Sequence, residues 1–86
     1  MNSILSEKDI KAVLEILVEQ LGVEESQLTA EARLVEDLGA DSLEKVEIMM
    51  ALEELFQISI PDEAADNVST VQDVLEAISD LVGSRR

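Results

Sequence analysis

The chain has 86 residues, a formal net charge of −14 and neither cysteine nor histidine. Nucleic acids and anionic membrane surfaces are polyanions, so this charge disfavours both as partners and favours proteins with basic patches. The lack of cysteine excludes disulfides, thiolate catalysis and cysteine-based metal sites within this chain.

Size and apolar content predict one small domain with a deformable core. Hydrophobic residues make up 47% of the chain, although Phe56 is the single aromatic residue, so Leu, Ile, Val and Met must build the core. No signal-peptide pattern is evident, and no apolar run approaches the ~20 residues of a membrane span. We therefore expect a soluble cytoplasmic protein, with a monomer as the default state.

The first predicted helix covers residues 7–21. Apolar residues recur at helical spacing on one face, Ser6 is placed to cap the start, and Gly22 is placed to end the helix. Residues 22–40 then form a long connection, which is usually functional or contains local turns. Scattered apolar residues predict that this connection packs against the domain. They are Val23, Leu28, Leu34 and Leu38.

The second predicted helix covers residues 42–56 and has two apolar ridges on roughly opposite sides. A bundle helix needs only one apolar face. The second ridge therefore either packs under the long connection or forms a docking stripe. We favour docking because acidic residues border the ridge. The core ridge is Ile48, Leu52, Leu55 and Phe56, and the second ridge is Leu43, Val46 and Met50.

Pro61 interrupts the helical pattern and favours a new helix start. Residues 62–66 are expected to form a short helical turn. The last helix is expected over 70–82, with Thr70 or the residue before it as the cap and Gly83 as the end. No useful strand pattern occurs. The sequence therefore predicts an all-α fold: a small four-helix bundle of three main helices plus one short helix, with a long loop after the first.

Ser42 is the most informative residue of the chain. It lies in the run Glu-Asp-Leu-Gly-Ala-Asp-Ser-Leu at positions 36–43, where a helix start offers unpaired N–H groups and a positive dipole end to a phosphate. No histidine is present to activate this serine as a nucleophile. We therefore interpret Ser42 as an attachment point that another enzyme modifies, and we predict no catalytic residue.

This run resembles the attachment motif of acyl carrier proteins, and further segments resemble the same family in the same order. The resemblance extends over nearly the whole chain without an internal gap. An Asp-Ser-Leu tripeptide alone is weak evidence, but this order and spacing on a small acidic helical chain is specific. The segments are Val35–Leu43, Ala51–Glu54, Ile60–Glu63 and Ser69–Val71, with Gln20–Val23 at the end of the first helix.

The resemblance implies a stand-alone carrier of the bacterial type II kind, with residues 1–86 as a single acyl carrier domain. Ser42 would accept 4′-phosphopantetheine from coenzyme A through a separate, Mg²⁺-dependent phosphopantetheinyl transferase. The thiol of this arm would carry acyl intermediates as thioesters in type II fatty acid biosynthesis. The protein itself is then not an enzyme, and its acyl chain would enter between the helices.

The resemblance and the acidic pattern together predict a docking surface for fatty acid synthesis enzymes with basic patches. No calcium-loop spacing occurs, so no specific metal site is expected. The predicted partner-binding residues are Asp41, Leu43, Glu44, Val46, Glu47, Met50, Glu53 and Glu54.

Three residues depart from the family pattern. Lys45 stands where a small polar residue is commoner, and Leu55 and Ser59 occupy positions that are often acidic, so their functional meaning stays open. Two other functions also stay open. One is a carrier for polyketides, lipid A, specialised lipids or aminoacyl groups, and the other is an acidic helical interaction protein whose Ser42 is unmodified.

Overall fold

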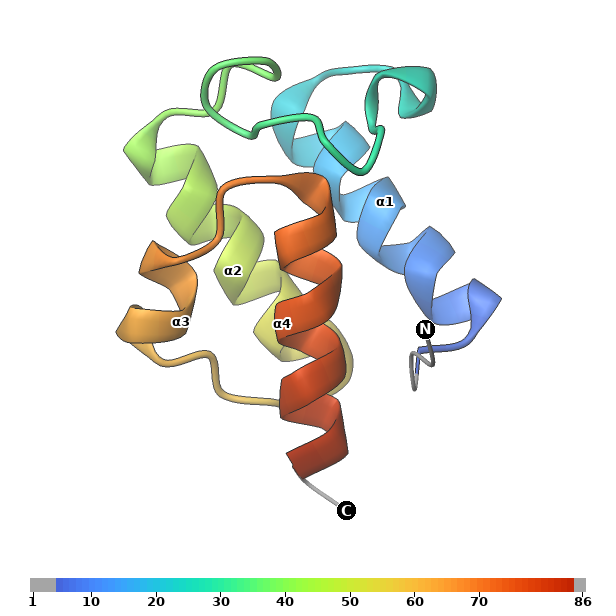
Figure 1. Cartoon of the computed structure of the whole chain (residues 1–86), viewed down its shortest axis with the longest axis vertical. Helices are drawn as coiled ribbons and strands as arrows, with labels where there is room; N and C mark the ends of the chain where they lie inside the picture. Colours follow the sequence, from blue (N-terminus) through green and yellow to red (C-terminus); the bar gives the residue numbers. More distant parts are fainter. Residues whose placement is uncertain (1–4, 85–86) are drawn as a thin grey trace.

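The structure, a computed structural model, describes residues 5–84 apart from the side chain of Ser84. Helices surround one apolar interior, and the long connection crosses one end of them (Figure 1). The described residues contain no strand, only an isolated bridge between Arg33 and Thr70, so the all-α prediction is confirmed. The elements are α1 (Glu7–Leu21), the 3-10 turn η1 (Glu25–Gln27), α2 (Ser42–Phe56), α3 (Asp62–Asp66) and α4 (Val71–Ser84).

Both predicted boundaries of α1 are confirmed. At its start, the Ser6 hydroxyl accepts the Asp9 amide at 3.1 Å, and the Asp9 carboxylate accepts the Ser6 amide at 3.2 Å. At its end, Gly22 adopts a left-handed conformation with φ 67° and donates its amide to Val18. Glycine lacks the Cβ that makes this conformation costly for other residues.

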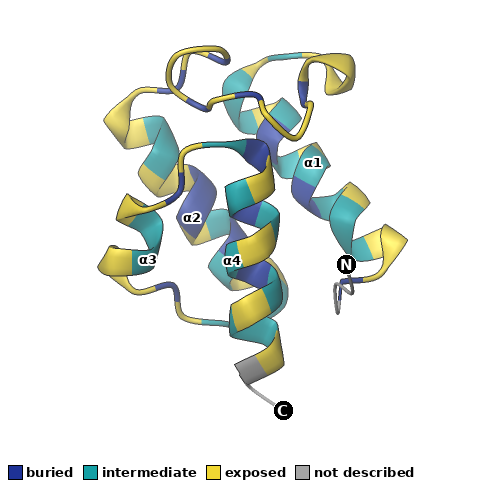
Figure 2. Ribbon diagram, in the orientation of Figure 1, coloured by how far each residue is buried: buried dark blue, intermediate teal, exposed yellow. Residues whose placement is uncertain are grey.

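The core is built mainly by α1, α2, α4 and the long connection, and Figure 2 shows buried positions on each of them. The helix α1 packs along α2. The single aromatic residue, Phe56, lies at the edge of this core and is only partly buried. The fully buried large side chains are Val13, Leu17, Leu34, Ile48, Leu52, Val71, Val74 and Ile78.

The predicted core ridge of α2 wrongly includes Leu55 and omits Met49. Leu55 is 46% exposed, whereas Met49, which belonged to neither predicted ridge, is only 8% exposed. Helical geometry turns Leu55 about 60° away from Leu52, on the side opposite Met49. The interior is centred between Ile48 and Met49, so Leu55 falls outside its edge.

The predicted end of the last helix is also wrong. The helix α4 continues through Gly83 to Ser84, instead of ending before Gly83. A glycine permits a left-handed helix end but does not require one, and an apolar contact from a following residue commonly supports it. Val23 follows Gly22 and packs on the core, whereas Gly83 is followed by Ser, Arg and Arg.

The connection over residues 22–40 is fixed to the start of α4 by three backbone hydrogen bonds, which confirms that it packs against the domain. The first amides of a helix have no partner within that helix. Carbonyl groups of the connection therefore provide partners for two of them. The bonds join Leu34 N to Ser69 O at 2.8 Å, Val71 N to Ala32 O at 3.0 Å and Gln72 N to Ala30 O at 3.1 Å.

Leu34 links the start of α4 to the start of α2. Its side chain is fully buried. Its amide donates to Ser69, and its carbonyl accepts the Ala40 amide at 2.8 Å. Ala40 is itself buried and directly precedes the first turn of α2. Leu34 thus helps to fix where the chain enters α2.

An ion pair closes the turn that follows Leu34. The Arg33 guanidinium donates to both carboxylate oxygens of Asp37 at 3.1 Å, and the Arg33 amide adds a third bond at 2.9 Å. These side-chain and backbone bonds hold the pKa of Asp37 below its usual range. The pair is solvent-exposed, so its main effect is on the shape of the turn rather than on stability.

The cap of α4 is formed by Thr70 and Asp73. The Thr70 hydroxyl accepts the Asp73 amide at 3.1 Å. The Asp73 carboxylate in turn accepts the amides of Ser69 and Thr70 at 3.0 and 3.1 Å. The backbone N–H groups of Ser69 and Thr70 lower the pKa of Asp73, because they stabilise its charged form.

Leu34→Ala should lower the free energy of unfolding by about 2–4 kcal/mol, the usual effect of truncating a fully buried leucine. The matched control is Val35→Ala, because Val35 is 53% exposed and its truncation should change stability by less than about 0.5 kcal/mol. Urea unfolding followed by circular dichroism measures both. Equal losses in the two variants would contradict the anchoring role of Leu34.

Asp73→Asn should lower stability at neutral pH by a few tenths to about 1 kcal/mol, because it removes a charged acceptor at a helix start. Since the folded-state pKa of Asp73 is depressed, this stabilisation is present above the ordinary value of 3.8. It is lost as the pH falls through the lower folded value. Unfolding measured from pH 7 to pH 2 should therefore show wild type and variant converging in acid.

Asp80→Asn is the control for that comparison. It makes the same charge change on α4 at an exposed side chain, near the helix end that disfavours negative charge. It should not lower stability at neutral pH, and a loss as large as that of Asp73→Asn would contradict the capping role.

Candidate functional site

Ser42 is the first residue of α2, and the preceding residue caps the helix in its place. The Asp41 carboxylate accepts the Glu44 amide at 2.7 Å, and the Glu44 carboxylate accepts the Asp41 amide at 3.1 Å. Ser42 is exposed, and its hydroxyl makes no hydrogen bond to any described residue. The hydroxyl is therefore free to react without disturbing the cap.

The chain around Ser42 leaves room for a second molecule to approach. Gly39, three residues earlier, adopts φ 77°, a conformation that favours glycine. A side-chain atom placed at Gly39 would meet nothing within 4 Å. Leu38 and Ala40 on either side are buried and hold this segment against the core. The segment before Ser42 is thus open to solvent at Gly39 and packed on the core at Leu38 and Ala40.

A groove of about 400 Å³ begins at Ser42 and lies between α2 and the segment that contains α3. Ser42, Lys45, Met49 and Glu53 all line it, at spacings that place them on one face of α2. The groove was not predicted from the sequence, although the helical spacing of these four residues indicates a shared face. The opposite wall comprises Ile60, Asp62, Ala65 and Asp66.

The second apolar ridge of α2 lies on the surface. Leu43, Val46 and Met50 are 65%, 54% and 60% exposed. The alternative in which this ridge packs under the long connection is therefore wrong. The acidic residues Glu47 and Glu54 are also exposed.

Among the described residues, Glu53 is the one acidic residue expected to bind partners whose side-chain hydrogen bond reaches a segment outside the start of α2. It is partly buried, and its carboxylate accepts the Ile60 amide at 2.6 Å. This bond ties α2 to the segment that leads into α3. Glu53 therefore has a structural role, and so do Asp41 and Glu44 in the cap of α2.

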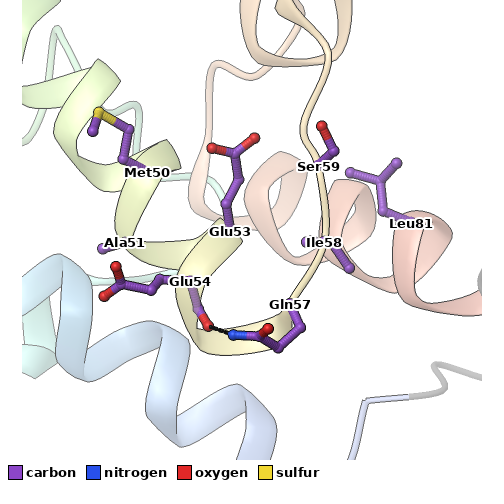
Figure 3. A pocket seen from close by; sticks show the side chains of 8 residues that line it. All are labelled: Met50, Ala51, Glu53, Glu54, Gln57, Ile58, Ser59 and Leu81. Atoms are coloured by element: carbon purple, nitrogen blue, oxygen red, sulfur yellow. Dashed lines mark hydrogen bonds between the residues drawn. The ribbon is translucent and has the colours of Figure 1, made fainter.

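An open hollow of about 910 Å³ lies near the other end of α2, beside Ile58, Ser59 and Leu81 of α4 (Figure 3). Met50 and Glu53 line both the hollow and the groove, so they separate the two. Gln57 ends α2 with φ 55°, and its side-chain amide donates to the Glu54 carbonyl at 2.8 Å (Figure 3). Ser59, one of the residues that departs from the family pattern, also lines this hollow.

Over residues 5–84, no three or more acidic side chains are arranged to hold a metal ion. None of the helices described for this chain has both the length and the apolarity needed to cross a membrane.

Comparison with known proteins identifies the family. Residues 11–78 match the family described as "Phosphopantetheine attachment site". The structure is also similar to that of a Mycobacterium tuberculosis protein provisionally named an acyl carrier protein. The TM-score is 0.78 and the sequence identity 32%, over 83% of this chain and 95% of the other. The chain therefore belongs to the phosphopantetheine attachment family, whose members are non-catalytic carriers with a covalent 4′-phosphopantetheine cofactor.

Proposed function

We propose that Ser42 is the attachment residue and that residues 1–86 act as one carrier domain for acyl groups, held as thioesters. The observation that carries this proposal is the unpartnered, exposed Ser42 hydroxyl at the mouth of a groove. Because Asp41 and Glu44 complete the helix cap, modification of Ser42 leaves the local fold unchanged.

The residues around Ser42 fit a phosphopantetheine arm. The amides at the start of α2 favour a phosphate group, and the groove leads from Ser42 past the buried side chains of Met49 and Ile60. An alkyl chain that leaves water gains roughly 0.8 kcal/mol per buried CH₂ group. A core without a buried aromatic ring can adapt to such a chain more readily than a rigid one.

Ser42 acts as an acceptor in this scheme. Its oxygen forms a bond to phosphorus in coenzyme A, the pyrophosphate linkage breaks, and the adenosine bisphosphate portion leaves. The hydroxyl proton passes to a group on the transferase, because this chain has no histidine. The thiol needed for thioester chemistry then comes from the attached arm, since the chain has no cysteine.

Incubation with coenzyme A, Mg²⁺ and a broad-specificity phosphopantetheinyl transferase should add one phosphopantetheinyl group, measured by intact mass. Ser42→Ala should gain nothing, and its helix content by circular dichroism should match the wild type. Ser59→Ala is the control, because Ser59 is exposed on another part of the surface, and it should load normally. Loading of Ser42→Ala, or no loading of the wild type by an active transferase, would overturn the proposal.

The exposed ridge of Leu43, Val46 and Met50 is the proposed docking surface for partner enzymes. An apolar stripe with an acidic border suits transient complexes, since the apolar part provides affinity and the charges speed and orient the encounter. Glu47 and Glu54 are the exposed charges best placed for this role. Asp41, Glu44 and Glu53 also contribute negative charge, but each is engaged in a hydrogen bond.

Glu47→Lys combined with Glu54→Lys should weaken binding to the transferase by roughly three- to tenfold, from two lost surface charge pairs. The wild-type dissociation constant should also rise with NaCl, because salt screens exposed charges. Titration calorimetry at two salt concentrations measures both effects. The control variant combines Glu15→Lys with Glu19→Lys and makes the same charge change at exposed positions of α1. It should bind the transferase more tightly than the α2 variant does. Equal or salt-independent affinities would contradict electrostatic docking to α2.

Type II fatty acid biosynthesis in the cytoplasm is the pathway we propose, with the resemblance to stand-alone carriers as its support. Lys45, Leu55 and Ser59 reduce the negative charge of the region around α2 relative to such carriers, which favours a carrier of another pathway as the second candidate. Mass spectrometry of the thioesters on this protein, isolated from its cells, distinguishes the two. Saturated and 3-oxo fatty acyl groups support the first candidate, and polyketide or aminoacyl groups support the second.

A further inference from the structure

Lys45 is the single basic residue between Leu34 and Ser84, and it lines the groove that begins at Ser42. It lies one helical turn beyond Ser42, and residues three apart on a helix have Cβ atoms about 5–6 Å from each other. Its side chain is partly buried. The flexible side chain therefore places an ammonium group within reach of anything bonded to the Ser42 oxygen.

Among the residues that the structure describes, none forms an ion pair with the ammonium group of Lys45. Across residues 5–84, the one ion pair within 4.0 Å joins Arg33 and Asp37. Lys45 thus stands unpaired although Asp62 and Asp66 line the facing wall of its groove. The Lys45 ammonium group therefore remains available to an anion that lies closer to it than the carboxylates of Asp62 and Asp66 do.

We propose that Lys45 binds the phosphodiester of the 4′-phosphopantetheine arm and thereby directs the arm into the groove between α2 and α3. This inference rests on the proposed attachment at Ser42. It assigns Lys45 a positioning role for the arm, without a part in the attachment chemistry.

Electrostatics explains why the arm needs this contact. A phosphodiester on Ser42 is repelled by the adjacent Asp41 and by Asp62 and Asp66 across the groove, so without a nearby cation it would turn outward. Lys45 is the one cation at this wall. The covalent link to Ser42 keeps the phosphate at a high effective concentration beside Lys45, and this proximity favours it over the opposite carboxylates.

A nitroxide on the arm can report where the arm lies, because the cysteine-free chain leaves the arm thiol as the single thiol. In the loaded, spin-labelled wild type, paramagnetic broadening of amide signals should concentrate on Ile60, Ala65 and Asp66. Lys45→Gln should reduce this broadening roughly two- to fivefold, the expected effect of one partly exposed ion pair. The ³¹P signal of the phosphodiester should shift in the same variant.

Two matched variants and a salt series complete the design. Lys45→Arg retains the cation and should restore the groove broadening, whereas Lys11→Gln removes one charge at an exposed position of α1 and should leave it unchanged. High NaCl should reduce the wild-type broadening. That series tests the contact even if Lys45→Gln is loaded poorly.

Three results would each overturn the contact. The first is equal broadening in wild type and Lys45→Gln, and the second is a loss of broadening in Lys11→Gln as large as that in Lys45→Gln. The third is wild-type broadening that does not change with NaCl. Intact mass is measured on every sample. Absence of the arm on the wild type would overturn the attachment at Ser42 together with this proposal, whereas a loaded chain without these differences overturns the role of Lys45 alone.

Discussion

The hydrogen bonds between the long connection and the start of α4 are the constraint on which the site depends. A helix start must find partners for its first amides, and here carbonyl groups of the connection provide them. Leu34 links this contact to the start of α2, because its amide donates to the Ser69 carbonyl and its own carbonyl accepts the Ala40 amide. Ser42 follows two residues after Ala40. These bonds therefore help to fix the position of Ser42, although it lies at the end of a connection of nearly twenty residues.

The five acidic residues expected to bind partners fall into two groups with different physical roles. Asp41, Glu44 and Glu53 accept backbone amides and hold the two ends of α2 in place. Glu47 and Glu54 are exposed and remain available to a partner. The large negative charge is therefore more than a means of steering basic proteins, because part of it completes hydrogen bonds that the helices cannot make internally.

The helix α2 has three faces with different surroundings: the core, the open surface and the groove. Ile48 and Leu52 pack in the core, Leu43 and Met50 lie on the open surface, and the groove face between them begins at Ser42. Under the proposed function, this one helix would support the fold, present a docking ridge and border the path of the covalent arm. The segment that contains the short α3 forms the opposite wall of the groove. The hydrogen bond from the Ile60 amide to the Glu53 carboxylate ties this segment to α2.

The sequence by itself determined the bounds of α1, α2 and α3 and the cap at Ser6, and it contains the motif around Ser42 that supports the proposed attachment. These features depend on residues close together in the chain, whose spacing and capping chemistry act locally. Tertiary structure decided the exposure of Leu55 and the burial of Met49, because helical periodicity cannot say where the neighbouring helices centre the interior. It also decided that Glu53 accepts the Ile60 amide, that α4 continues past Gly83, and that a groove opens between α2 and α3. Each of these depends on which distant or following segments are present to pack against the residue, and local spacing does not contain that information.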